Sequence, residues 1–363
     1  IIFNMDISEF LQNKNYKKGG LKNIGATCYI NTLIQCLCSC SYFVNFILSD
    51  VYLDRIQDNN SVDFITEMRS IVNSLLVDGN SLIPIRFLKT LKLKFDFIDI
   101  NEQNDLHEIL LLILNKMNEE IKVSDTIKYF DTNILRANIN NKDTEYKKLD
   151  DKCYKMWYEL HKKEYSELTE LFYGQSISQI VCGNCNHIHH NNEFFNILDL
   201  ELPKQVDPKI PIDIYDCIEK HTSIEFLNYN IDDDKWKCDV CNESKKSEKI
   251  IRHWKFPPIL IVCLKRFYFD KNLNRMIKNN SLVDIPYEID LKNYTMSNKC
   301  KTKYKLQSVG LHFGNIYGGH YSALVRKDIN SDDEWLLIDD LTINTIQKKD
   351  INFNFAYMLF YSL

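Results

Sequence analysis

The chain has 363 residues and a formal net charge of −5, and 45% of its residues are hydrophobic. This composition is typical of a folded globular protein, and the lack of a basic excess argues against a general nucleic-acid binder. No apolar run approaches the roughly 20 residues that cross a bilayer, so we expect no membrane segment.

The first chemical signal is a glycine-punctuated loop, residues 20–27, that leads into a predicted helix beginning at Cys28. The apolar residues that follow recur at helical spacing: Ile30, Leu33, Ile34 and Leu37. Thr27 is a suitable N-cap, and the partial positive charge of a helix N-terminus stabilises a thiolate. We therefore predict that the pKa of Cys28 is lowered and that its thiol is a nucleophile. Taken alone, a buried structural cysteine is an equal alternative.

Secondary structure is predicted to change along the chain. Helical periodicity recurs at 62–76 and 102–121, whereas the Asn-, Lys- and Asp-rich stretch 138–152 is predicted to be a solvated loop. Beyond about Phe172, short β-rich segments are bounded by Gly, Pro, Asn or Asp. These predicted strands are 176–182, 194–202, 259–269, 304–313, 321–326, 335–338 and 356–361. The predicted fold class is α+β, with a helical lobe, a largely antiparallel β lobe and a cleft between them.

Two Cys-x-x-Cys pairs lie in the β-rich part: Cys182, Cys185, Cys238 and Cys241. Their spacing is typical of a closed, tetrahedral zinc site with four thiolates, so we predict one structural Zn²⁺. The alternatives are a redox dithiol or chance pairs, but a redox motif does not need a second pair. The chain has 12 cysteines and no visible secretory leader. This usage suits a reducing compartment, and we expect a cytoplasmic and/or nuclear location.

The second chemical signal is His320, which follows Gly318 and Gly319 at the start of an alternating segment. If this segment forms a hairpin with the one ending at Asp339, pairing His320 with Asp339 centres the turn in the polar stretch 328–333. The imidazole would then act as a base for a thiol, oriented by the carboxylate. Each residue alone has an ordinary structural alternative, but their joint occurrence with Cys28 favours a cysteine protease.

These motifs resemble those of the ubiquitin-specific proteases, a large papain-like family of cysteine deubiquitinases. Residues 20–31 are similar to the family's cysteine box, and residues 319–321 with 335–340 are similar to its histidine box. Further landmarks match in order at 103–108, 171–174, 257–267 and 356–361. The resemblance implies a papain-like fold with a helical thumb, a β-rich palm and zinc-bearing β fingers. It divides the chain into an N-terminal extension (1–19) and one catalytic domain (20–363), made of thumb (20–170), fingers (171–255) and palm (256–363).

The resemblance also implies a catalytic role for particular residues. Cys28 would be the nucleophile, His320 the general base and Asp339 its orienting group, although the adjacent Asp340 could share or replace that role. Asn23 would supply an amide donor to the oxyanion hole; an ordinary loop residue bonding its own backbone is the alternative.

Substrate contacts are implied in the same way. Asp105 and Glu108, at the start of a predicted helix, would meet the arginine-rich tail of ubiquitin, although acidic residues there also favour the helix dipole. Residues expected to line a channel for the Gly-Gly end of that tail are Gly318, Gly319 and Tyr321.

The predicted function is that of a thiol-dependent deubiquitinase, which hydrolyses isopeptide or peptide bonds at the C-terminal glycine of ubiquitin through an acyl-enzyme. The expected partners are ubiquitin and ubiquitinated proteins, and the catalytic domain is expected to be monomeric. One alternative is a catalytically silent ubiquitin-binding scaffold, which is disfavoured because every catalytic position holds a competent residue. The other alternative, a protease for a ubiquitin-like modifier, stays open because such tails also end in Gly-Gly.

Overall fold

The fold is described from a computed structural model of the chain. The structure describes residues 17–56, 63–123, 144–162, 164–205, 207–228, 235–271, 273–297, 300–328 and 331–363. Most of the expected N-terminal extension, 1–19, therefore lies outside the described residues. Within them, no single helix is long and apolar enough to cross a membrane; α2 (Cys28–Leu37) and α3 (Ser41–Leu48) pass such a test only as a pair bent by 91°.

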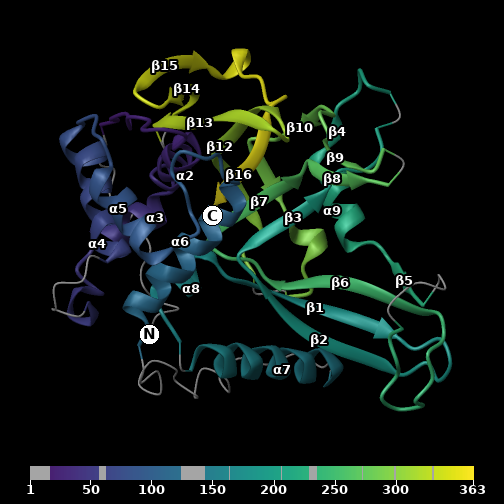
Figure 1. Ribbon diagram of the computed structural model, residues 1–363. Coiled ribbons are helices and arrows are strands. Elements are labelled where there is room, and N and C mark those ends of the chain that lie inside the picture. The colour runs from purple at the N-terminus through teal and green to yellow at the C-terminus, as the bar shows by residue number, and fades with distance from the viewer. Residues whose placement is uncertain are drawn as a thin grey trace.

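Helices dominate the first part of the described chain, as predicted. After α2 and α3 come α4 (Phe64–Val72), which continues into a π-helical stretch (Asn73–Asp78), α5 (Ile85–Lys94), α6 (Leu106–Ile121), α7 (Thr144–His161) and α8 (Glu167–Phe172). Figure 1 shows α2 to α6 gathered on one side of the molecule, with α7 separate beneath β1 (Gly174–Val181) and β2 (Ile188–Phe195). One further helix, α9 (Ile214–Thr222), lies among the strands of the second part.

The loop predicted at 138–152 is wrong from residue 144 onward, where α7 begins; residues 138–143 lie outside the described part. The segment is mostly polar, but Leu149, Cys153 and Trp157 recur every four residues and form an apolar stripe on one side of the helix. Cys153 packs with Ile177 and Trp254 of the neighbouring sheet, and Leu149 packs against this cluster. Tertiary burial of that stripe explains why the segment is helical.

Two antiparallel-rich sheets form the second part. The larger has eight strands in the order β15-β14-β13-β12-β16-β7-β3, with β11 added on β12, and only the β3–β7 pair within it is parallel. The smaller has the order β2-β1-β6-β5. Short ribbons pair β8 with β9 and β4 with β10. The strands span β1 (Gly174–Val181), β2 (Ile188–Phe195), β3 (Ile197–Glu201), β4 (Ile212–Asp213), β5 (Glu225–Leu227), β6 (Ser247–Lys255), β7 (Ile259–Lys265), β8 (Phe267–Asp270), β9 (Arg275–Lys278), β10 (Val283–Asp284), β11 (Glu288–Asp290), β12 (Lys303–Asn315), β13 (Gly318–Asp328), β14 (Ser331–Asp339), β15 (Thr342–Gln347) and β16 (Ala356–Ser362).

Two predicted strands are interrupted. The segment 194–202 comprises the end of β2 and all of β3, and 259–269 comprises β7 and most of β8. The second break falls at the buried Arg266, whose Nε donates to the Ala356 carbonyl oxygen at 2.6 Å. Its Nη1 donates to the carbonyl oxygens of Asn279 and Ser281, each at 3.0 Å. The guanidinium thus satisfies carbonyl groups at the start of β16 and in the loop after β9.

Helix α2 joins the two parts of the fold. All ten of its residues are buried, and it packs against β13 and β12 of the larger sheet. The same hydrophobic core contains Ile30 and Leu33 of α2 together with Ala323 and Val325 of β13. The first turn of α2 is therefore held against the strand that begins with Gly318, Gly319 and His320. The predicted α+β class is confirmed.

Candidate active site

The loop before Cys28 has one conformation that requires glycine. Gly25 has a φ of +85°, and a Cβ there would lie 2.8 Å from Asn101 Oδ1 and 2.9 Å from the Ile100 carbonyl oxygen. The next residue, Ala26, donates its N–H to that same carbonyl oxygen at 2.9 Å. The loop is thus fastened to the chain just before α6, and Cys28 emerges as the first residue of α2.

Thr27 occupies the N-cap position of α2, as predicted, but its side chain does not cap the helix. Its Oγ1 instead accepts a hydrogen bond from the N–H of Ile24 at 3.1 Å. The hydroxyl closes the preceding turn, which leaves the N–H groups of the first helical turn free of a side-chain cap. An anion at this helix end would be stabilised by those groups.

The predicted lowering of the Cys28 pKa is wrong for this structure. Cys28 is only 2% exposed, and burial raises the pKa of its thiol. Backbone N–H groups of Tyr321 and Tyr29 oppose this effect, while the negative charge of Asp340 adds to it. Desolvation of the thiolate outweighs the helix N-terminus. Cys28 therefore lies near Tyr321, the residue that directly follows His320, and both belong to the same hydrophobic core.

His320 and Asp339 meet, although not in the predicted register. The Nε2 atom of His320 lies 2.5 Å from Asp339 Oδ1, and the two side chains are 40% and 49% exposed. The contact leaves Nδ1 as the ring nitrogen available to a thiol. An imidazole paired in this way with a carboxylate has a fixed ring orientation.

A register shift explains the difference from the sequence prediction. Near the turn Asp328 pairs with Ser331, as a turn within 328–333 requires, but the register shifts between Arg326 and Asp328. Beyond the shift Ala323 pairs with Ile338. Continuing that register by one residue sets Ser322 opposite Asp339, so His320 reaches the carboxylate as a diagonal neighbour on the same face.

Asp340 connects the two motifs in a different way. Its Oδ2 accepts from Asn23 Nδ2 at 3.1 Å and its Oδ1 accepts from Asn31 Nδ2 at 2.8 Å, while its carbonyl oxygen accepts from the N–H of Leu21 at 3.0 Å. It has a φ of 52°, the left-handed conformation that Asp tolerates better than most residues. Asp340 therefore fastens the cysteine loop and α2 to the end of β14. Sequence reasoning missed Asn31, whose only signal is an amide three residues after Cys28 on a buried helix.

Asn23 is held on both sides of its amide. Its Oδ1 accepts from the N–H of Thr27 at 2.9 Å, while one hydrogen of Nδ2 goes to Asp340. The amide Nδ2 carries two hydrogens, so one donor remains beyond the bond to Asp340. The structure thus fixes the orientation of Asn23, five residues before Cys28.

Asp105 and Glu108 differ in their surroundings. Asp105 is the N-cap of α6: its Oδ1 accepts from the N–H of His107 at 2.7 Å, and its Oδ2 accepts from the buried hydroxyl of Tyr357 at 2.7 Å. These contacts give Asp105 a structural role within the fold. Glu108, one residue beyond His107, is exposed.

The two glycines before His320 also differ. A Cβ on Gly318 would find its nearest neighbour, Gln103 Oε1, at 3.7 Å, so packing within the described chain does not require glycine there. A Cβ on Gly319 would lie 2.3 Å from His312 Nε2, so internal packing does require it. Tyr321 is buried beside the rings of His312 and Tyr357.

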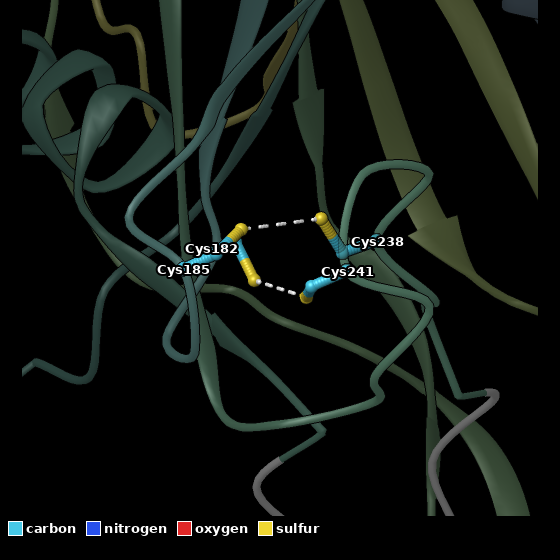
Figure 2. Close-up of side chains that lie close together, drawn as sticks. All are labelled: Cys182, Cys185, Cys238 and Cys241. Atoms are coloured by element: carbon cyan, nitrogen blue, oxygen red, sulfur yellow. Dashed lines mark hydrogen bonds between the residues drawn. The ribbon is translucent and has the colours of Figure 1, made fainter.

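The four cysteines predicted as metal ligands come together at the far end of the smaller sheet (Figure 2). Cys182 Sγ lies 3.7 Å from Cys241 Sγ, and Cys185 Sγ lies 3.7 Å from Cys238 Sγ. Tetrahedral coordination with Zn–S bonds of about 2.3 Å places sulfur atoms about 3.8 Å apart. The donor set and its spacing therefore fit a zinc ion.

The two cysteine pairs have the same local geometry. The N–H of Asn186 donates to the Cys182 carbonyl oxygen at 3.0 Å, and that of Asn242 donates to the Cys238 carbonyl oxygen at 2.9 Å. Both asparagines adopt positive φ, 58° and 57°. Among the nearby histidines, His189 Nε2 lies 3.3 Å from Cys238 Sγ, which suits a hydrogen bond to a sulfur ligand.

A second mixed group lies within the fold. Donor atoms of His107, Asp199 and Cys263 lie within 4.8 Å of one another, and His107 Nε2 is 3.2 Å from Asp199 Oδ1. The hydrogen bond to Asp199 raises the pKa of His107 despite its partial burial. Burial also raises the pKa of the Cys263 thiol. The contact between His107 and Asp199 connects α6 to β3.

The sequence of this chain is similar to those of known proteins. Residues 19–361 match the sequence model of the ubiquitin carboxyl-terminal hydrolase family. The chain is 28% identical over 378 residues to ubiquitin carboxyl-terminal hydrolase 4 of Saccharomyces cerevisiae strain RM11-1a, which covers 94% of this chain and 39% of that protein. It is 26% identical over 350 residues to ubiquitin carboxyl-terminal hydrolase 2 of Homo sapiens, which covers 95% of this chain and 55% of that protein. The chain thus spans about two fifths to just over half of these relatives.

Solved structures support the fold. The SAGA Ubp8/Sgf11/Sus1/Sgf73 DUB module bound to ubiquitin aldehyde contains a chain with a TM-score of 0.71 and 21% identity, and the match covers 97% of this chain and 70% of that one. The same module with a singly substituted Ubp8, bound to monoubiquitin, gives a TM-score of 0.70 at 20% identity, covering 99% and 75%. The expected papain-like α+β fold is confirmed.

Proposed function

Because this chain belongs to the ubiquitin carboxyl-terminal hydrolase family, we propose that it acts as a cysteine-dependent deubiquitinase, which cleaves the bond after the C-terminal glycine of ubiquitin. One observation carries the proposal: His320 contacts Asp339 through Nε2, while Cys28 lies against the backbone of Tyr321 at the start of a buried helix. A thiol, an imidazole and a carboxylate are the three parts that nucleophilic acyl transfer by cysteine requires.

The reaction begins with proton transfer. Because burial raises its pKa, the Cys28 thiol is neutral at rest and needs a base. His320 Nδ1 takes the proton, and Asp339 stabilises the resulting imidazolium. The thiolate attacks the glycine carbonyl carbon, the imidazolium gives its proton to the leaving amine, and an acyl-enzyme remains. Water deprotonated by His320 then releases the ubiquitin carboxylate and the free thiol.

Charge on the tetrahedral intermediate falls on the former carbonyl oxygen. The remaining Nδ2 hydrogen of Asn23 and the backbone N–H of Cys28 are the donors we assign to it. Bonds from Asn23 to Asp340 and Thr27 preorganise the amide before substrate arrives. Such preorganised donors typically contribute roughly 2.7–4 kcal/mol each to transition-state stabilisation.

We propose that Asp339 orients the His320 ring and that Asp340 orients the cysteine loop. Asp339→Ala is expected to lower kcat about 10- to 100-fold, because the ring loses its carboxylate partner. Asp340→Ala should cost less, because it removes contacts to Asn23 and Asn31 rather than to the base. Steady-state kinetics on a ubiquitin C-terminal fluorogenic amide measures both, with Asp350→Ala as an exposed control. A larger loss from Asp340→Ala than from Asp339→Ala would transfer the orienting role to Asp340.

For the substrate tail, we assign Glu108 rather than Asp105 as the carboxylate that pairs with arginine. The carboxylate of Asp105 already bonds the N–H of His107 and the hydroxyl of Tyr357, whereas Glu108 is exposed. Packing within the described chain does not require a glycine at position 318, so we propose that Gly318 lines the channel for the tail. Gly319 and Tyr321 border that channel and also serve internal packing.

Glu108→Gln is expected to raise KM for the ubiquitin amide about two- to fivefold with kcat nearly unchanged, since an exposed ion pair contributes up to about 1 kcal/mol. Kinetics at low and high salt provide the measurement, because the wild-type advantage should shrink as salt screens the pair. Glu119→Gln, at the other end of α6, is the matched control. An unchanged KM at low salt would remove Glu108 from the substrate site.

For the metal, we propose one structural Zn²⁺ held by Cys182, Cys185, Cys238 and Cys241. When bound, zinc supplies a cross-link between two loops and no chemistry of hydrolysis. Cys182 and Cys185 lie in the loop after β1, and Cys238 and Cys241 lie in the loop before β6. A bound zinc would therefore join these two loops at the end of the smaller sheet. This sheet corresponds to the fingers, and the helices α2 to α6 and the larger sheet to the thumb and palm.

For the partners, we propose ubiquitin and ubiquitinated proteins, encountered in the cytoplasm and/or nucleus by a monomeric domain. The experiment that tests the function is hydrolysis of a ubiquitin C-terminal fluorogenic amide, run beside the same leaving group on ubiquitin-like modifiers that end in Gly-Gly. Turnover of the ubiquitin substrate supports the proposal. Turnover of a modifier substrate alone would make the chain a protease for that modifier, and binding of ubiquitin without turnover would make it a scaffold.

A further inference from the structure

A polar network lies next to Gly319, the glycine that precedes His320. Lys278, the last residue of β9, donates through Nζ to Nδ1 and to the carbonyl oxygen of His312, both at 2.8 Å, and to the carbonyl oxygen of Gly314 at 3.1 Å. Lys278 belongs to the short β8–β9 ribbon, whereas His312 and Gly314 belong to β12. One ammonium group thus ties that ribbon to the strand end from which the chain turns back toward His320.

The state of His312 fits this role. Burial, followed by the nearby charge of Lys278, lowers the pKa of His312 to about 4. The ring is therefore neutral at pH 7, and Nδ1 accepts the hydrogen bond from Lys278, which leaves the ring hydrogen on Nε2. That Nε2 faces Gly319, where a Cβ would lie only 2.3 Å away. The ring also packs against Tyr321, with centroids 4.6 Å apart.

Gln103 holds Gly319 from another direction. The N–H of Gly319 donates to Gln103 Oε1 at 2.5 Å, and Gln103 Nε2 donates to the Gly319 carbonyl oxygen. One side-chain amide therefore satisfies both backbone groups of this residue, while the His312 ring packs on its Cα. The backbone that leads into His320 is confined between Gln103 and His312.

We propose that Lys278 is a positioning residue for the hydrolysis: by holding the His312 ring against Gly319, it fixes the backbone from which His320 reaches Asp339. This inference rests on the proposed function. Lys278 touches neither His320 nor Asp339 through any contact that the structure describes, so it acts through His312 and Gly319. Small displacements of a catalytic group lower the rate strongly, because the reacting atoms must be aligned before proton transfer.

The network also has a pH dependence of its own. A protonated lysine offers three N–H donors to the three acceptors around it, whereas the neutral amine offers two. Burial, followed by the charge of Arg266, lowers the pKa of Lys278 to about 8. The groups that face its Nζ are Arg266, the neutral His312 and the ring of Phe267, whose centroid is 5.9 Å away. One of the three hydrogen bonds is therefore lost as the pH rises through about 8.

The test compares wild type, Lys278→Met, Lys278→Arg and the control Lys271→Met, an exposed lysine near the tip of the same ribbon. Wild-type turnover of the ubiquitin amide tests the proposed function separately. In a chain that turns over, Lys278→Met is expected to lower kcat about tenfold or more at pH 7 with KM changed less than threefold and the melting temperature close to wild type. Lys271→Met should match wild type. A kcat for Lys278→Met within twofold of wild type would overturn the proposal.

The Lys278→Arg variant provides a second test of the proposal, which is valid even if Lys278→Met does not fold. Arginine keeps its charge throughout the accessible pH range. Wild type is expected to lose a larger fraction of its kcat between pH 7 and pH 9 than Lys278→Arg loses. Coincident profiles for the two proteins would show that Lys278 does not control the position of His320, and would overturn the proposal.

Discussion

Cys28→Ala is expected to abolish turnover of a ubiquitin C-terminal fluorogenic amide, with a loss of kcat of at least about 10⁴-fold, while ubiquitin binding persists. Cys28 carries the only thiol in the first turn of α2, and removal of a catalytic nucleophile costs about as much as removal of the whole catalytic triad. Parallel measurements of kcat and of ubiquitin affinity by calorimetry separate the two properties. The small volume change in a buried site should leave the fold intact.

Cys38→Ala is the matched control for this prediction. Cys38 is also buried and lies at the other end of α2, so the substitution removes a buried thiol of the same helix without touching the proposed site. Its kcat should stay within about threefold of wild type. Substantial turnover by Cys28→Ala, or an equal loss in both variants, would remove Cys28 as the nucleophile.

The second large effect is expected at the four cysteines. Metal analysis of the purified wild-type chain should find about one zinc per chain, and Cys182→Ser should reduce this to near zero and cause aggregation. Structural zinc sites contribute apparent binding free energies of about 10–16 kcal/mol in small zinc-finger peptides, and without metal the four thiols lose their cross-link. Zinc content by mass spectrometry and the melting temperature with and without chelator give the readouts.

Cys300→Ser provides the control for the zinc prediction. Cys300 lies outside the cluster, and its sulfur accepts from the N–H of Phe256 at 3.4 Å, a bond that a serine hydroxyl can also make. This variant should keep its zinc and its melting temperature. A wild-type chain that is free of zinc, soluble and fully active would show that the four cysteines do not hold a structural ion.

The sequence predicted those parts of the site that depend on local pattern. The Cys-x-x-Cys spacing determines where paired sulfur atoms can lie, and both pairs converge as expected. The apolar spacing after Cys28 similarly predicted α2 at its observed start. In α7, by contrast, the polar composition outweighed a stripe of only a few apolar residues, and burial against β1 and β6 decided the structure.

Properties that depend on tertiary contacts could not be predicted from the sequence. The hairpin turn was predicted near 328–333, but the irregularity between Arg326 and Asp328 leaves no clear sequence signal and shifts the pairing of His320. The pKa of Cys28 follows its burial rather than its place at a helix N-terminus. Lys278 and His312 lie 34 residues apart in the sequence, and neither belongs to a recognisable motif. The two residues come together next to Gly319 only in the folded chain.

Cys28 is thus assigned as the nucleophile of a protease specific for ubiquitin. The most direct measurement is reaction with ubiquitin bearing a C-terminal electrophile, in parallel with equivalent probes built on ubiquitin-like modifiers, followed by mass-spectrometric mapping of the modified residue. We predict a single adduct with the ubiquitin probe, located on Cys28 and absent from Cys28→Ala. An adduct on another cysteine would show that Cys28 is not the nucleophile, and reaction with a modifier probe but not with ubiquitin would show that the protease is not specific for ubiquitin.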